Sequence, residues 1–143
     1  METKRSNHLF ANGFNCSQAI LAAQSESLGV DIETASRMAV AFGGGVGRQG
    51  RMCGCVSGAL MTIGLKHGHD STNDTKKRIQ AYELAKAFCT RFIEVNGALD
   101  CRDIIRYNLD HPEERQKAQE SNVFQTRCAR VVANTEMLLK EFL

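Results

Sequence analysis

The sequence contains no tryptophan, only one proline, and little excess charge of either sign. Lys and Arg number 18 against 16 Asp and Glu, a formal net charge of +2, far from the basic surplus typical of nucleic-acid-binding proteins. Uninterrupted apolar runs are much shorter than the roughly 18 residues of a membrane-spanning helix. Residues 1–15 also lack the apolar segment of a secretory signal. We therefore expect a cytoplasmic protein that neither inserts into a membrane nor binds nucleic acid.

Length and composition predict one helical domain. A chain of 143 residues with 43% hydrophobic and 24% charged residues has the size and composition of a single globular domain. A single proline removes the strongest helix breaker, and no segment alternates polar and apolar residues with the period of a strand. We predict an all-α protein, a compact bundle of about six or seven helices in a single domain over residues 1–143.

Apolar residues recur at helical spacing in most of the chain, and glycine or capping residues separate the helical segments. Helices are expected over residues 15–28, 31–42, 53–67, 74–96 and 100–109, from residue 111, and from 124 to the end. On two of them the buried stripe is predicted to be Ala35, Met38, Ala39 and Phe42, and Ile79, Tyr82, Ala85, Cys89 and Phe92. Gly58 and Gly64 indicate that the helix over 53–67 packs closely against a neighbour, because glycine otherwise weakens a helix.

Six cysteines are too few for a secreted disulfide scaffold and are more typical of metal ligands, catalytic thiols or buried residues. Cys16, Cys53 and Cys101 each fall at the predicted start of a helix. Unpaired N–H groups and the positive end of the helix dipole stabilise a thiolate there. Arg48 and Arg51 before Cys53, and Arg102 after Cys101, add positive charge nearby. These three thiols are therefore candidates for ionised, reactive groups.

The other three cysteines have different surroundings. Cys89 and Cys128 lie on apolar helical stripes, and we interpret Cys89 as a small buried hydrophobic residue. Cys55 follows Cys53 by two positions, a spacing that could chelate a metal or close a strained disulfide. Residues two apart on a helix point to different faces, so joint action of Cys53 and Cys55 requires the pair to precede the helix.

Several motifs, in order along the chain, resemble those of one known family. They are Gly13-Phe14-Asn15-Cys16-Ser17-Gln18-Ala19, the glycine segment Phe42-Gly43-Gly44-Gly45-Val46-Gly47-Arg48, Cys53-Gly54-Cys55-Val56-Ser57-Gly58-Ala59-Leu60-Met61, Cys101-Arg102 and Cys128. The pattern resembles the C_GCAxxG_C_C family, whose members are described as redox-active. The resemblance implies that the four cysteines of the family correspond to Cys16, Cys53, Cys101 and Cys128. Its CGAxxG motif falls on residues 53–58, so Cys55 stands where alanine is usual, and Cys89 lies outside the pattern.

The first hypothesis for the function is thiol–disulfide or electron-transfer chemistry of an oxidoreductase-like protein. Cys16, Cys53, Cys101 and Cys128 are then the reactive residues, brought together from separate helices. We expect Cys53 to be the attacking thiol, with Cys16 or Cys101 as its partner, because Cys53 combines a helix start, flanking arginines and a glycine loop. Neither the residues nor the resemblance identifies a substrate or redox partner, and the disulfide chemistry requires no cofactor.

The second hypothesis is a binding site for a metal, in which the same four cysteines hold zinc or an iron–sulfur cluster, with Cys55 as an added ligand. Larger haem-bearing relatives of the family are associated with an iron–sulfur centre. The resemblance therefore adds an iron–sulfur cluster to this second hypothesis. A third hypothesis is a structural helical module whose cysteines are simply buried. In each case the short apolar stripes are consistent with a homodimer.

Overall fold

The computed structural model describes residues 4–143, which form eight α-helices and no strand. The helices are α1 (Arg5–Ala11), α2 (Cys16–Ser25), α3 (Ile32–Ala39), α4 (Gly54–His67), α5 (Thr75–Asn96), α6 (Cys101–Ile105), α7 (Pro112–Glu120) and α8 (Ala129–Leu139). The predicted all-α fold is confirmed, and α1 is a helix that the sequence pattern did not indicate. None of the helices described is long and apolar enough to cross a membrane.

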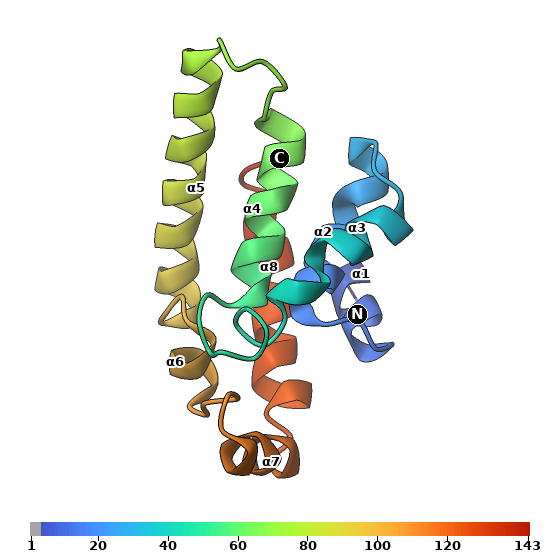
Figure 1. Cartoon of the computed structure of the whole chain (residues 1–143), viewed down its shortest axis with the longest axis vertical. Helices are drawn as coiled ribbons and strands as arrows, with labels where there is room; N and C mark the ends of the chain where they lie inside the picture. Colours follow the sequence, from blue (N-terminus) through green and yellow to red (C-terminus); the bar gives the residue numbers. More distant parts are fainter. Residues whose placement is uncertain (1–3) are drawn as a thin grey trace.

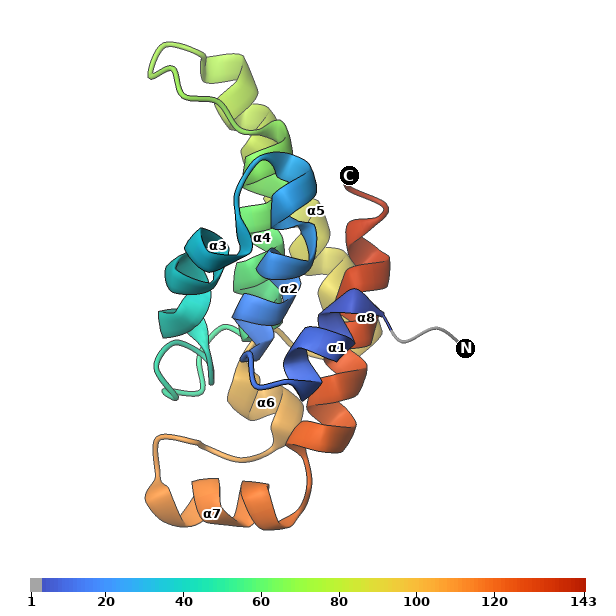
Figure 2. The ribbon, with the colours of Figure 1, turned by 90° about the vertical axis from the view of Figure 1, so that its right-hand side faces the viewer.

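Three of the helices, α4, α5 and α8, run side by side along the long axis, and α2 packs against α4 with α1 and α3 outside it (Figure 1). Figure 2 shows α6 and α7 at one end of this bundle. The main hydrophobic core lies between α2, α4, α5, α6 and α8. Its largest fully buried side chains are Phe88, Phe92, Ile20, Ile105 and Leu139.

The predicted helix boundaries rest on local capping groups, and the structure confirms the main ones. The Asn15 side chain accepts a hydrogen bond from the backbone N–H of Gln18, and Asp31 and Asp74 cap α3 and α5 in the same way. Gly97 ends α5 with a left-handed φ of 93°. These signals involve residues at most four positions apart, which explains why the sequence alone revealed them.

Two predicted buried stripes are partly wrong. On α5, Ile79 is 53% exposed and Tyr82 is 62% exposed, whereas Phe88 and Phe92 are fully buried. Both residues belong to the first turns of α5, and these turns extend past the ends of α2 and α8 (Figures 1 and 2). On α3, Met38 is 51% exposed because α3 lies on the outside of α2. Spacing identified the helices but not which part of each one meets a neighbour.

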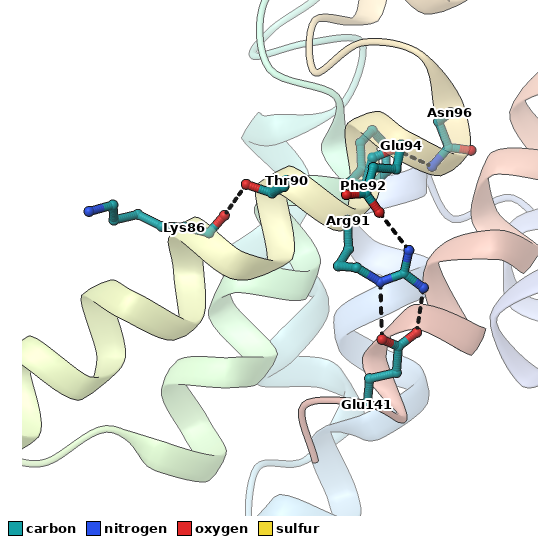
Figure 3. Close-up of polar contacts among 7 residues, drawn as sticks. All are labelled: Lys86, Thr90, Arg91, Phe92, Glu94, Asn96 and Glu141. Carbon is teal, nitrogen blue, oxygen red and sulfur yellow. Dashed lines mark hydrogen bonds and ion pairs between the residues drawn. The ribbon is translucent and has the colours of Figure 1, made fainter.

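An ion-pair network fastens the end of the chain to α5. The Arg91 guanidinium donates two hydrogen bonds to the Glu141 carboxylate, at 3.1 and 2.9 Å, and a third to Glu94 at 2.8 Å (Figure 3). The ring of Phe142 next to Glu141 packs edge-on against Phe88, with ring centroids 5.5 Å apart. These contacts hold the segment after α8 against the core.

Two helices, α2 and α4, approach closely because α4 lacks side chains where they meet. A Cβ atom on Gly58 would lie 2.7 Å from the Ser17 carbonyl oxygen and 3.1 Å from Ile20 Cβ. Gly64, one and a half turns further along α4, has open space around it. The expectation that glycine in this helix marks a close helix contact is therefore confirmed for Gly58 and wrong for Gly64.

This difference gives a matched pair of variants. We expect Gly58→Ala to destabilise the protein by about 1–3 kcal/mol, because the added methyl group meets the α2 backbone. Gly64→Ala should stabilise it by about 0.5–1 kcal/mol, because alanine has a higher helix propensity than glycine and the added methyl group meets no other atom. Urea denaturation measures both free energies of unfolding. Equal stabilisation by the two variants would show that α2 and α4 do not pack at Gly58.

Candidate functional site

Five of the six cysteines line one cavity of about 470 Å³. They come from four separate regions of the chain: Cys16, Cys53, Cys55, Cys101 and Cys128. The fold thus brings together all four cysteines that the sequence put forward, and Cys55 joins them. Cys89 is half-buried on α5 and does not line the cavity, in agreement with its interpretation as a packing residue.

Three of these thiols form a compact cluster, which we call the thiol triad: Cys16, Cys53 and Cys55. Their sulfur atoms all lie within 4.8 Å of one another. All six cysteines are free thiols in this structure. The spacing is close enough for hydrogen bonds between the thiols and for coordination of a shared ion.

Cys16 reaches the triad because α4 begins with a glycine. Cys16 is the first residue of α2, and the Asn15 cap fixes the start of that helix. A Cβ atom on Gly54 would collide with Cys16 Sγ. Only glycine at position 54 therefore lets the sulfur of Cys16 lie against the first turn of α4.

Cys53 and Cys55 face the same cavity because Cys53 lies outside the helix. Cys53 is the N-cap of α4, with ψ of 135°, and the helix itself begins at Gly54. The sequence-based expectation that the two act together only if both precede the helix is therefore wrong, because Cys55 lies in the first turn of α4 and its sulfur is still within 4.8 Å of that of Cys53. Cys55 is 1% exposed and Cys53 is 8% exposed.

A short backbone pairing joins the starts of α4 and α6. Met52 and Asp100 form an antiparallel bridge. On either side of it, the Cys53 N–H donates to Leu99 O at 2.8 Å and the Cys101 N–H donates to Arg51 O at 2.6 Å. The pairing places Cys101 beside the triad although 48 positions separate it from Cys53. No local signal in the sequence indicates this contact.

The triad favours a single thiolate, on Cys16. Hydrogen bonds from the Cys53 and Cys55 thiols lower the pKa of Cys16 well below its ordinary value, with help from the Ser17 and Gly44 backbone, although burial opposes the shift. The same hydrogen bonds to Cys16 raise the pKa values of Cys53 and Cys55, and burial adds to both shifts. The electrostatics therefore favour Cys16, and not the expected Cys53, as the attacking thiol.

Cys101 and Cys128 remain protonated thiols. Burial raises the pKa of each to about 12, and the nearby Cys16 charge contributes to both shifts. The expectation that a helix start and neighbouring arginines would ionise Cys101 and Cys53 is wrong. The hydrogen bond with Cys16 raises the pKa of Cys53, burial raises that of Cys101, and no arginine is among the causes of either shift.

The remaining walls of the cavity are mostly apolar, with the amides of Asn15 and Gln119 and two cations among them. Phe10, Ile104, Ile105, Leu109, Phe124 and Val131 supply large apolar surfaces. Arg48 from the glycine loop and Arg115 from α7 are the charged residues among those lining it. No sequence pattern pointed to Arg115, because the polar residues of α7 indicate only a solvated helix.

The fold and this site define an all-α protein with a buried cluster of thiols. A family model described as "Putative redox-active protein (C_GCAxxG_C_C)" matches residues 14–142, and the chain belongs to this family. The chain is also similar to a protein of Archaeoglobus fulgidus described as "Uncharacterized protein", with 29% identity over 126 residues, which is 82% of this chain and 83% of the relative. No solved structure matches.

The hydrogen bonds in the triad predict how the reactivity of Cys16 depends on pH. Cys16 should be alkylated by iodoacetamide at half its maximal rate at a pH below the pKa of about 8.5 of a free cysteine. Replacing both donors in Cys53→Ala/Cys55→Ala should move this midpoint to higher pH. The matched control Cys53→Ser/Cys55→Ser keeps a donor at each position and should move it less. Site-resolved peptide mass spectrometry measures each profile.

Proposed function

We propose that this protein is a thiol–disulfide redox protein in which Cys16 is the attacking thiolate and Cys53 the resolving thiol. The observation that carries the proposal is the thiol triad, with three sulfur atoms within 4.8 Å of one another, an arrangement that lowers the pKa of Cys16. A thiolate is the nucleophile in disulfide exchange, and a second thiol nearby resolves the intermediate. The redox activity described for the family supports the same chemistry.

The proposed reaction reduces a substrate disulfide by two electrons. Cys16 Sγ attacks one sulfur of the substrate, the substrate S–S bond breaks, and the first substrate thiolate leaves and takes up a proton. Cys53 then loses its proton and attacks Cys16 Sγ. A protein disulfide forms, and the second substrate thiol is released. The protein dithiol is oxidised, and a reducing thiol compound restores it by the reverse exchange.

Cys53 fits the resolving role better than Cys55 does. Its hydrogen bond is the largest contribution to the lowered pKa of Cys16, and the two sulfurs lie within 4.8 Å of each other. Cys55 donates a hydrogen bond to Cys53 as well, which makes Cys53 the easier of the two to deprotonate. Cys101 and Cys128 line the same cavity and, in this proposal, stay in the thiol form while Cys16 and Cys53 form the disulfide. The cytoplasmic location expected from the sequence fits this proposal, because a reducing compartment keeps all of these thiols available.

A second candidate is coordination of a soft metal ion, and the geometry of the triad favours it too. Tetrahedral zinc with Zn–S bonds of about 2.3 Å requires sulfur atoms about 3.8 Å apart, and the triad provides three sulfurs within 4.8 Å of one another. Cys101 or Cys128 would complete a set of four thiolates around zinc or an iron–sulfur cluster. Bound metal would keep these thiols deprotonated and would remove the dithiol chemistry.

Thiol counting under controlled oxidation tests the first candidate. Fully reduced protein should show six titratable thiols, one for each cysteine. Mild oxidation should remove two of them, and peptide mapping should find a Cys16–Cys53 bond. Cys16→Ser should abolish this bond. Cys89→Ser is the matched control and should leave it intact, because Cys89 lies outside the cavity.

Elemental analysis and visible absorption of protein purified without oxygen test the second candidate. Stoichiometric zinc or iron that protects Cys16, Cys53 and Cys55 from alkylation would overturn the disulfide proposal in favour of the metal site. Metal-free protein that forms the Cys16–Cys53 bond would overturn the metal site. Protein with neither metal nor a reversible disulfide would leave only the structural module.

A further inference from the structure

The thiols of the site are largely buried where they line the cavity. Cys53 and Cys101 are each 8% exposed, Cys55 is 1% exposed, and Cys16 is half-buried. A thiol that reduces disulfides on the surface of folded proteins must itself project from the surface. Here the substrate has to enter a space of about 470 Å³, within the range of roughly 300–1,000 Å³ that holds small molecules.

Apart from the Cys16 thiolate, the charged side chains that line this cavity are cationic. Arg48 and Arg115 line it, and the lining includes no Asp, Glu or Lys. Arg115 Nε is buried without a hydrogen-bond partner. Among residues 4–143, no ion pair or side-chain hydrogen bond engages either guanidinium. A buried donor without an acceptor is unfavourable, and an anionic group on a ligand would satisfy it through a charge-assisted hydrogen bond.

The apolar walls of the cavity favour a ligand with a hydrocarbon portion. Phe10, Leu109 and Phe124 line the same cavity as the arginines and the thiols, together with the isoleucines of α6. A bare inorganic anion would leave these surfaces in contact with water, whereas a carbon chain would cover them. The cavity therefore combines a cationic group, an apolar wall and a sulfur nucleophile.

We propose that the substrate is a small organic disulfide carrying a carboxylate or a similar anionic group, which Arg115 and Arg48 bind while its sulfur–sulfur bond meets Cys16. This inference rests on the proposed thiol–disulfide function and adds the class of substrate to it. The exchange is the two-electron reaction given above, with the anionic disulfide as the oxidant. Arg115 is the principal anion-binding residue because its Nε is the buried donor without a partner.

Charge selectivity is a sharp test because an attacking thiolate is itself negative. Without cationic groups nearby, a thiolate reacts faster with a positively charged disulfide than with a negatively charged one, since opposite charges attract. A preference for the anion must therefore come from the walls of the cavity. The matched probes are dithiodiglycolate (anionic), bis(2-hydroxyethyl) disulfide (neutral) and cystamine (cationic), which differ little in size.

The experiment mixes reduced full-length protein with each disulfide at low salt and follows the second-order loss of titratable thiols. The anionic probe should react at least about tenfold faster than the neutral one, the equivalent of one charge-assisted hydrogen bond, and cystamine should react slowest. Arg115→Gln should remove this preference and make cystamine the fastest. Arg102→Gln is the matched control, an exposed arginine beside Cys101 that does not line the cavity, and should keep the wild-type order.

A binding measurement separates the two proposals. Thiodiglycolate, the thioether that lacks the sulfur–sulfur bond, should bind the wild-type protein in calorimetry and bind Arg115→Gln at least about tenfold more weakly. If all three disulfides react at similar rates whatever their charge, the proposal of an anionic substrate is wrong, and the thiol–disulfide function still holds. If the thiols react with none of the three disulfides, the thiol–disulfide function is wrong. The substrate class is then wrong as well, even if thiodiglycolate binds.

Discussion

The close approach of α2 to α4 is the constraint on which the whole site depends. Gly54 and Gly58 lie one turn apart on α4 and together leave a flat surface against which α2 packs. Gly58 sets the distance between the helix backbones, and Gly54 makes room for Cys16 Sγ. A glycine inside a helix costs about 1 kcal/mol relative to alanine. The burial of Ile20 and Val56 in the core beside this contact offsets that loss. The packing of α2 against α4 at Gly54 and Gly58 therefore determines both the stability of the fold and the geometry of the site.

The second constraint is electrostatic: a buried cavity tolerates one thiolate more easily than several. Desolvation opposes ionisation of every thiol in the cavity. Cys16 overcomes it because two thiols and two backbone groups hydrogen-bond to its sulfur. Once Cys16 carries the charge, the same charge raises the pKa values of Cys101 and Cys128. The arrangement thus selects one nucleophile and keeps its potential partners protonated.

The sequence predicted the features of this site that depend on neighbouring residues. Asn15 and Cys16 at a helix start, and Gly58 at a close helix contact, are local patterns that the structure bears out, whereas Gly64 makes no such contact. The identity of the thiolate could not be predicted, because it depends on contacts between residues 16, 53 and 55 that the fold creates. The burial of individual residues could not be predicted either, because it also depends on contacts that the fold creates. Spacing alone could not show that α5 projects past its neighbours and leaves Tyr82 exposed.

Cys55 shows how the site differs from the pattern that the chain resembles. The resemblance places alanine at this position, so Cys55 is not one of the four cysteines that correspond to the family pattern. In this chain Cys55 adds a second thiol donor to Cys16 and one to Cys53. With alanine there, Cys16 would keep the hydrogen bond from Cys53 and would lose part of its stabilisation as a thiolate. Cys55 therefore adjusts the acidity of a nucleophile that the fold already positions, and the chemistry of the site does not originate with it.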